Sequence, residues 1–268
     1  RRQRQMCIRD SDKRERENFC LSKFWRYAAV IVVLFSVSYF SYWRGGISIK
    51  EVFSDIIVEA PLGSRTKLTL PDGTLVWLNA GSRITYSQGF GVGNRKIELI
   101  GEGYFEVKRN EEVPFLVKTN SLLVKVLGTK FNFRDYPDDA EAIVSLSEGK
   151  VALNNLLKKE KEAFLLPNER VVLNKKNGRM HVEYSTVSNA LQWTNGYLFF
   201  DEELLPDVVK ELERSYNVKI QIASDTLNTF RFYGNFVHRE QNIQEVLEAL
   251  SATRKIHYII EGHNITLY

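Results

Sequence analysis

Apolar and polar residues alternate through residues 47–187 with the two-residue period that is typical of β-strands. The clearest segments are KIELIGEGYFEV (96–107), PFLVKT (114–119), SLLVKVLGTKFNFRDY (121–136), AIVSLSEGKVAL (142–153) and ERVVLN (169–174). Turn signals separate them at Gly128, Asp138-Asp139 and Glu148-Gly149, and Asp72-Gly73 lies between two apolar runs, as in a hairpin. We therefore predict an all-β domain over 47–187, of the sandwich, barrel or solenoid type.

The apolar period becomes helical towards the C-terminus. One helical face is formed by Leu205, Val208, Val209, Leu212 and Tyr216, with Pro206 suited to a first turn. Asn242 and Glu245 have capping-box spacing and open a second helix. Strand patterns surround both helices: VKIQI (218–222), FRFYGNF (230–236) and a final hairpin over 256–268. This order predicts a small βαβ-βαβ domain over 196–268, with two helices on one sheet.

Residues 24–43 form a long apolar segment, without charge from Tyr27 to Trp43. Its length is at the lower end of what spans a bilayer, and its apolar residues surround the helix rather than forming a stripe. Aromatic and basic residues at both ends, Trp25, Arg26, Trp43 and Arg44, are expected to anchor it at the lipid surfaces. We predict a single transmembrane helix; a cleaved signal peptide and a buried helix of a soluble protein are the alternatives.

The positive charge of the chain is concentrated at its N-terminus. Residues 1–26 hold nine Lys or Arg and four acids, a net charge of +5, whereas the remainder carries 28 basic and 29 acidic residues. This argues against direct nucleic-acid binding, which needs basic charge on a folded face. The positive-inside rule places a basic tail (1–23) in the cytoplasm and the C-terminal domains on the other side of the membrane.

Glu102 and Glu106 resemble a pair of catalytic carboxylates. On a strand, however, residues four apart are separated by about 13 Å, wider than glycoside hydrolases use. Glycines at 101 and 103 and aromatic residues at 104 and 105 favour the strand. We therefore expect strand acids that are solvated or that set the strand register.

Other signals of catalysis or cofactor binding are weak. The four histidines lack metal-ligand spacing, and both cysteines, Cys7 and Cys20, precede the apolar segment. GFGVGN (89–94) is followed by a strand pattern instead of a helix, so it is interpreted as a loop and not a phosphate cradle. We expect no catalytic residues, no metal and no cofactor, so the protein is predicted not to be an enzyme.

Six segments resemble the FecR family of membrane-anchored anti-sigma regulators in order and spacing. They are LPDGTLVWLNAGS (70–82), RKIELIGEGYFEV (95–107), PFLVKT (114–119), VLGTKFNF (126–133), LSEGKVAL (146–153) and LPNERVVL (166–173). The last 80 or so residues resemble the secretin/TonB short N-terminal-like module that ends many Bacteroidetes-type members. The resemblance implies a FecR-type β domain followed by that module, and no enzymatic activity.

The resemblance also implies partners. The C-terminal part would engage the N-terminal signalling domain of a TonB-dependent outer-membrane receptor, which takes up an iron chelate or a glycan. The signal would then pass from the periplasm across the bacterial inner membrane to an extracytoplasmic-function (ECF) sigma factor in the cytoplasm. Family members carry a helical sigma-binding domain before the membrane segment, and only 23 residues precede Phe24 here. We expect a truncated N-terminus or a sigma contact reduced to the basic tail.

One strand of the C-terminal domain is the predicted partner-binding element. It combines aromatic residues with a glycine that permits close backbone approach: Phe232, Tyr233, Gly234, Asn235 and Phe236. Ordinary core alternation explains the same pattern. Two other functions stay open: an anchored periplasmic glycan-binding or scaffold module, favoured by aromatic residues of the β domain, and a hydrolase that uses Glu102 or Glu106.

Overall fold

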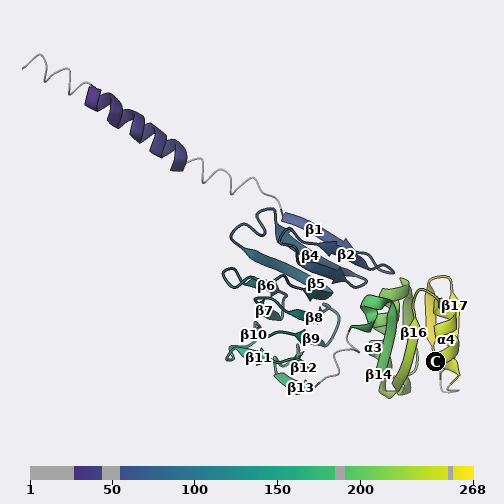
Figure 1. The fold of residues 1–268 in the computed structure, drawn as a ribbon. Helices are drawn as coiled ribbons and strands as arrows, with labels where there is room; N and C mark the ends of the chain where they lie inside the picture. Colours follow the sequence, from purple (N-terminus) through teal and green to yellow (C-terminus); the bar gives the residue numbers. More distant parts are fainter. Residues whose placement is uncertain (1–26, 44–54, 185–190, 253–255) are drawn as a thin grey trace, which may run out of the picture. The chain divides into compact units, whose positions relative to one another are not determined.

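The computed structural model describes residues 27–43, 55–184, 191–252 and 256–268 (Figure 1). The basic tail and the predicted anchor residues Trp25, Arg26 and Arg44 lie outside this part of the chain. The chain divides into two compact units, Arg1–Phe53 and Ser54–Tyr268.

In the first unit, residues 27–43 form an α-helix. Its apolar side chains, among them Val33, Phe35 and Val37, are exposed, and Trp43 at its end packs against Phe40 with ring centroids 6.5 Å apart. Among the described residues, no helix reaches the length and apolarity usually required of a transmembrane segment.

Thirteen strands of the second unit form one branched sheet, in agreement with the predicted all-β domain. The strands are β1 (Asp55–Ala60), β2 (Thr66–Thr69), β3 (Leu75–Leu78), β4 (Ser82–Ser87), β5 (Arg95–Glu106), β6 (Phe115–Lys118), β7 (Leu122–Val126), β8 (Lys130–Asp135), β9 (Glu141–Glu148), β10 (Val151–Asn155), β11 (Ala163–Leu165), β12 (Glu169–Asn174) and β13 (Met180–Tyr184). We refer to residues 55–184 as the β domain.

The long strand β5 belongs to both halves of this sheet. Its first half pairs with β4 and β6, and its second half pairs with β3 and β8. Between the halves lies Gly101, whose φ of +97° is a conformation that residues with a side chain rarely adopt. A Cβ at this position would lie 2.5 Å from the Ser82 hydroxyl, so the crossing point needs glycine.

A single hydrophobic core is formed by inward-facing residues of both halves. Ile97 and Leu99 come from the first half of β5, Phe105 from its second half, and Phe131 stacks on Phe105 with ring centroids 5.1 Å apart. Alternation along the strands produces this arrangement, because every second side chain of a strand points to the same face. The predicted turns at Asp72-Gly73, Gly128 and Glu148-Gly149 and the GFGVGN loop are confirmed.

Residues 192–268, the C-terminal domain, have their own core and contain both predicted helices. The elements are a 3₁₀ turn (Gln192–Asn195), β14 (Tyr197–Leu204), α3 (Leu205–Tyr216), β15 (Lys219–Ile222), a second 3₁₀ turn (Asp225–Thr229), β16 (Arg231–Val237), α4 (Ile243–Ser251), β17 (Tyr258–Glu261) and β18 (Asn264–Leu267). Pro206 lies in the first turn of α3, and the Asn242–Glu245 capping box is present at α4.

The prediction of one sheet in this domain is wrong. Strand β14 pairs with β16 in one two-stranded sheet (Figure 1), while β15, β18 and β17 form another. The core contains side chains from both sheets and both helices, including Phe200, Phe236, Leu212 and Leu267. Strand patterns alone do not show which strands are neighbours, because several pairings bury the same apolar faces.

Candidate functional site

Glu102 is buried, contrary to the expectation of a solvated strand acid. The strand itself is confirmed, but only 6% of the residue's surface is exposed. Its carboxylate oxygens accept hydrogen bonds from the side-chain amides of Asn79, at 2.8 Å, and Asn132, at 2.7 Å. Its backbone N–H donates to the Ser82 hydroxyl. Two amide donors therefore hold the carboxylate, and the backbone hydrogen bond to Ser82 fixes the strand beside it.

The cover over Glu102 comes from the C-terminal domain. Glu102 and Asn132 lie on the face of β5 and β8 opposite the hydrophobic core, which in a free sheet would face water. The indole N–H of Trp193 donates to the Asn132 side chain at 3.2 Å. On α3, the Glu211 carboxylate accepts from the same Asn79 amide nitrogen, at 3.4 Å. Both faces of this part of the sheet are thus covered.

Arg214 of α3 forms a buried polar link between the two domains. Its side chain is almost fully buried and donates to the Asp139 carboxylate at 3.0 Å. Its guanidinium lies over the ring of Tyr136, 4.0 Å from the centroid, and approaches Glu211 at 3.4 Å. Because Arg134 of β8 also donates to Asp139, at 2.8 Å, this one carboxylate joins the β domain to α3.

Burial and neighbouring charges perturb several groups of this interface. Burial raises the pKa of Glu102 above its usual range, although Arg134 and the two amides oppose the shift. Burial would also raise the pKa of Asp139, but Arg134 and Arg214 outweigh it and the pKa lies below its ordinary value. Burial lowers the pKa of Arg65, whose Nε donates to Asn79 at 3.0 Å.

We call this set the polar interface: Arg65, Asn79, Glu102, Asn132, Arg134, Tyr136, Asp139, Trp193, Glu211 and Arg214. Its carboxylates are all engaged by amide or guanidinium donors, an arrangement that fixes α3 against the sheet. Sequence reasoning missed it, apart from noting Glu102. Only one feature of the sequence pointed to this interface. The strands carry acidic and amide side chains on the face that was expected to be in contact with water.

Strand β16 contains the predicted partner-binding residues. Phe232 and Phe236 are buried with nearly parallel rings 6.2 Å apart. Gly234 lies between them, because a Cβ there would approach the two rings to 2.7 and 2.8 Å, so the glycine serves core packing. Tyr233, 60% exposed, and Asn235 face outward. Of the five residues, these two and the strand backbone remain accessible.

One edge of β16 has no strand partner among the described residues, and at its end the Val237 backbone is bonded to Glu240 and Gln241. Among the strands that the structure describes, β16 pairs only with β14. The Tyr233 hydroxyl donates to the carboxylate of Glu202, which lies at a bulge in β14 with a φ of +56°. The outward face therefore combines a tethered tyrosine with unpaired strand backbone.

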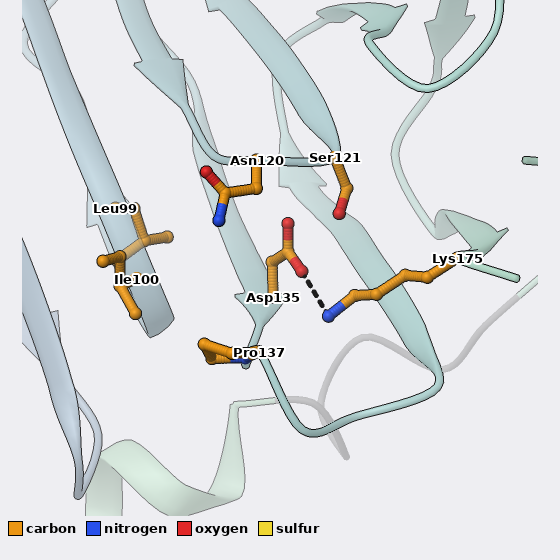
Figure 2. A pocket seen from close by; sticks show the side chains of 7 residues that line it. All are labelled: Leu99, Ile100, Asn120, Ser121, Asp135, Pro137 and Lys175. Carbon is orange, nitrogen blue, oxygen red and sulfur yellow. Dashed lines mark ion pairs between the residues drawn. The ribbon is translucent and has the colours of Figure 1, made fainter.

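A small cavity opens in the β domain beside residues 135–139 (Figure 2). Its lining consists of Leu99, Ile100, Asn120, Ser121, Asp135, Pro137 and Lys175. Asp135 and Lys175 form an ion pair of 2.6 Å inside it. No residue of this cavity was singled out from the sequence, since the four segments that form it are far apart along the chain.

Comparison with known proteins gives matches over both domains. A family model described as FecR protein matches residues 57–152, and one described as FecR, C-terminal, matches residues 197–267. Two crystal structures of a candidate anti-sigma factor from Parabacteroides distasonis, at 1.65 and 2.50 Å resolution, are 33% identical with TM-scores of 0.73. Each covers 80% of this chain, and the chain covers 98% and 99% of theirs. No curated protein matches.

Proposed function

Because the chain belongs to the FecR family, we propose that it is an anti-sigma regulator, a binding protein whose partner is a sigma factor. The support is the extent of the similarity, which spans the β domain and the C-terminal domain and almost the whole of a solved candidate anti-sigma factor. The polar interface fits a signalling role better than a catalytic one. Its carboxylates are engaged by amide and guanidinium groups of the protein, which leaves them less available to a substrate.

The proposed signal comes from the N-terminal signalling domain of a TonB-dependent outer-membrane receptor. Its docking site is β16, and the single observation that carries this assignment is the open edge of that strand beside exposed Tyr233 and Asn235. An unpaired edge offers backbone donors and acceptors to a partner strand, and neighbouring side chains add selectivity. The polar interface would pass a displacement of the C-terminal domain to the β domain through α3.

The proposed topology places these domains in the periplasm and the N-terminus in the cytoplasm, where an ECF sigma factor would bind. Its support is the sequence: an uncharged apolar run from Tyr27 to Trp43, flanked on the N-terminal side by more Lys and Arg than on the other. Residues 24–43 would be the single anchor in the inner membrane.

Binding of the full chain to the receptor's signalling domain tests the docking site. Tyr233→Ala is expected to weaken binding by about tenfold or more, as at an aromatic hot spot. Tyr184→Ala is the matched control, because Tyr184 is an exposed tyrosine on another edge strand, β13. Equal affinities of the wild type and the Tyr233 variant would contradict the assignment.

Co-expression of the protein with an ECF sigma factor from the genome that encodes it tests the regulatory function separately. The two proteins should be purified together when the full-length natural protein is used, and removal of everything that precedes residue 24 should abolish that association. Recovery of no sigma factor with the full-length natural protein, under conditions where the receptor domain still binds, would contradict the anti-sigma function and leave the docking site intact.

A further inference from the structure

We propose that the cavity of Figure 2 is a binding site for a small, uncharged polyol of about monosaccharide size. The site belongs to the β domain, whereas β16 belongs to the C-terminal domain. Its volume is about 160 Å³. A water molecule occupies about 30 Å³ in the liquid, so the cavity exceeds the space that a single structural water needs.

Asp135 supplies the strongest reason to expect a ligand. Its side chain is 4% exposed, and the Oδ1 atom receives the ammonium of Lys175 at 2.6 Å. The second oxygen, Oδ2, is buried and has no hydrogen-bond donor among the described residues. Buried carboxylate oxygens in folded proteins nearly always have a donor. An O–H or N–H group of a ligand in the cavity would supply this donor.

Lys175 supplies a donor beside this acceptor. An ammonium has three N–H groups. The Lys175 ammonium donates one to Asp135 and one to the backbone oxygen of Tyr136, so one remains. A single hydroxyl can donate to Asp135 and accept from Lys175 at the same time. Two adjacent hydroxyls fit the pair equally well.

The rest of the lining narrows the ligand class. In Figure 2 Asn120 and Ser121 lie above Asp135, while the apolar lining residues Leu99 and Ile100 lie to the left and Pro137 lies below. Asp135 and Lys175 neutralise each other, so the site has no net charge with which to attract an ion. Hydroxyls on one face and C–H groups on the other are the chemistry of a sugar ring or a cyclic polyol.

The position of the cavity gives such a ligand a route to the C-terminal domain. Asp135 and Pro137 line it, while Tyr136 and Asp139 of the same short segment hold Arg214 of α3. A ligand that restrains Asp135 therefore acts on the segment to which α3 is attached. Binding of a ligand at this site would therefore change how firmly this segment holds Arg214 in the polar interface.

Titration of the ¹⁵N-labelled full chain with D-glucose, D-galactose and myo-inositol, each up to tens of millimolar, tests the proposal by NMR. At least one polyol is expected to give saturable shifts of the Ile100 and Ser121 amides. Glycine at the same concentrations serves as the zwitterion control. Saturable binding of glycine, or no saturable shift with any polyol, would overturn the proposed ligand class.

Two variants locate the binding. Asp135→Asn replaces the free acceptor by an amide, and Ser121→Ala removes one hydroxyl while the Asp135–Lys175 pair stays intact. Each is expected to weaken polyol binding by about tenfold, the loss of one or two hydrogen bonds. Asp201→Asn, at an exposed strand position of the C-terminal domain, is the matched control and should bind as the wild type does. Unchanged affinity in a folded Ser121→Ala variant would overturn the site.

Discussion

The β domain and the C-terminal domain differ in the pairing of their strand edges and in the burial of their polar groups. Both halves of the large sheet enclose one continuous core and share β5, and its polar outer face is covered by Trp193 and α3. The C-terminal domain instead has two small sheets, and β16 keeps an open edge. The comparison indicates a rigid scaffold that holds α3 and a smaller module that presents backbone to a partner.

The largest expected effect is on unfolding: truncation of a buried aromatic side chain should destabilise the domain that contains it and not the other domain. Phe131→Ala removes a fully buried ring of the β domain, and we expect a loss of about 3–5 kcal/mol in the free energy of unfolding of that domain. Phe232→Ala should open the C-terminal core while leaving the β domain folded, because the two cores are separate clusters. Hydrogen exchange along a denaturant series measures both. Simultaneous loss of both domains in the Phe232 variant would contradict the distinction.

The polar interface should matter far more than an exposed ion pair. Arg214→Gln leaves Asp139 with only Arg134 and is expected to cost about 3 kcal/mol, as for a buried pair that loses one partner. Arg109→Gln breaks the exposed pair with Glu111 and should cost less than about 1 kcal/mol. Urea unfolding of both variants gives the comparison. Equal losses would show that the domains are not tied through Arg214.

The crossing point of β5 should not tolerate a side chain. Gly101→Ala adds a Cβ that meets Ser82 and also strains a positive φ, so we expect a loss of about 2–3 kcal/mol. Gly93→Ala is the matched control, since Gly93 has a φ of +102° but no atom within 4 Å of the added Cβ. Thermal unfolding midpoints measure the difference, which isolates the contact from the backbone strain. Equal midpoints would contradict the role of Gly101 in joining the two halves.

Buried Glu102 should give the polar interface a pH dependence. Because its folded-state pKa is raised, its favourable contribution is complete below the unfolded pKa of about 4.3 and is lost as pH rises through the folded pKa. The stability of Glu102→Gln relative to the wild type should therefore increase as pH rises above about 4.3. Asp139 contributes stability above its unfolded pKa of about 3.9, and this stability is lost only as pH falls through its lower folded pKa, outside that range.

Urea midpoints across this pH range measure the effect. Glu98→Gln, at an exposed position of the same strand, controls for the loss of a charge alone. A stability difference between Glu102→Gln and the wild type that stays constant with pH would show that the carboxyl is not desolvated in the folded protein.

Much of the fold follows from local patterns. The hairpin at Asp72-Gly73, the helical face of α3 and the Asn242–Glu245 cap are determined by residues close in sequence, and all are present. The burial of Glu102 was not predictable in this way. Its cover comes from Trp193 and Glu211, about a hundred residues further along the chain, and nothing in the strand indicates what packs on its outer face.

Gly234 shows a second limit of sequence reasoning. A glycine between aromatic residues in a strand predicts close approach of another chain, and equally predicts room for the neighbouring rings. The structure shows the second, with Phe232 and Phe236 filling the space. The partner site on β16 stays a prediction that depends on Tyr233, Asn235 and the open edge.

Hydrogen–deuterium exchange of the full chain, with and without the receptor's signalling domain, locates the docking site. We expect the partner to slow exchange of backbone amides in Arg231–Val237, since a docked strand would pair with the edge of β16 that has no described strand partner. Binding that protects β1, β13 or β17 instead, and leaves β16 unchanged, would contradict this expectation.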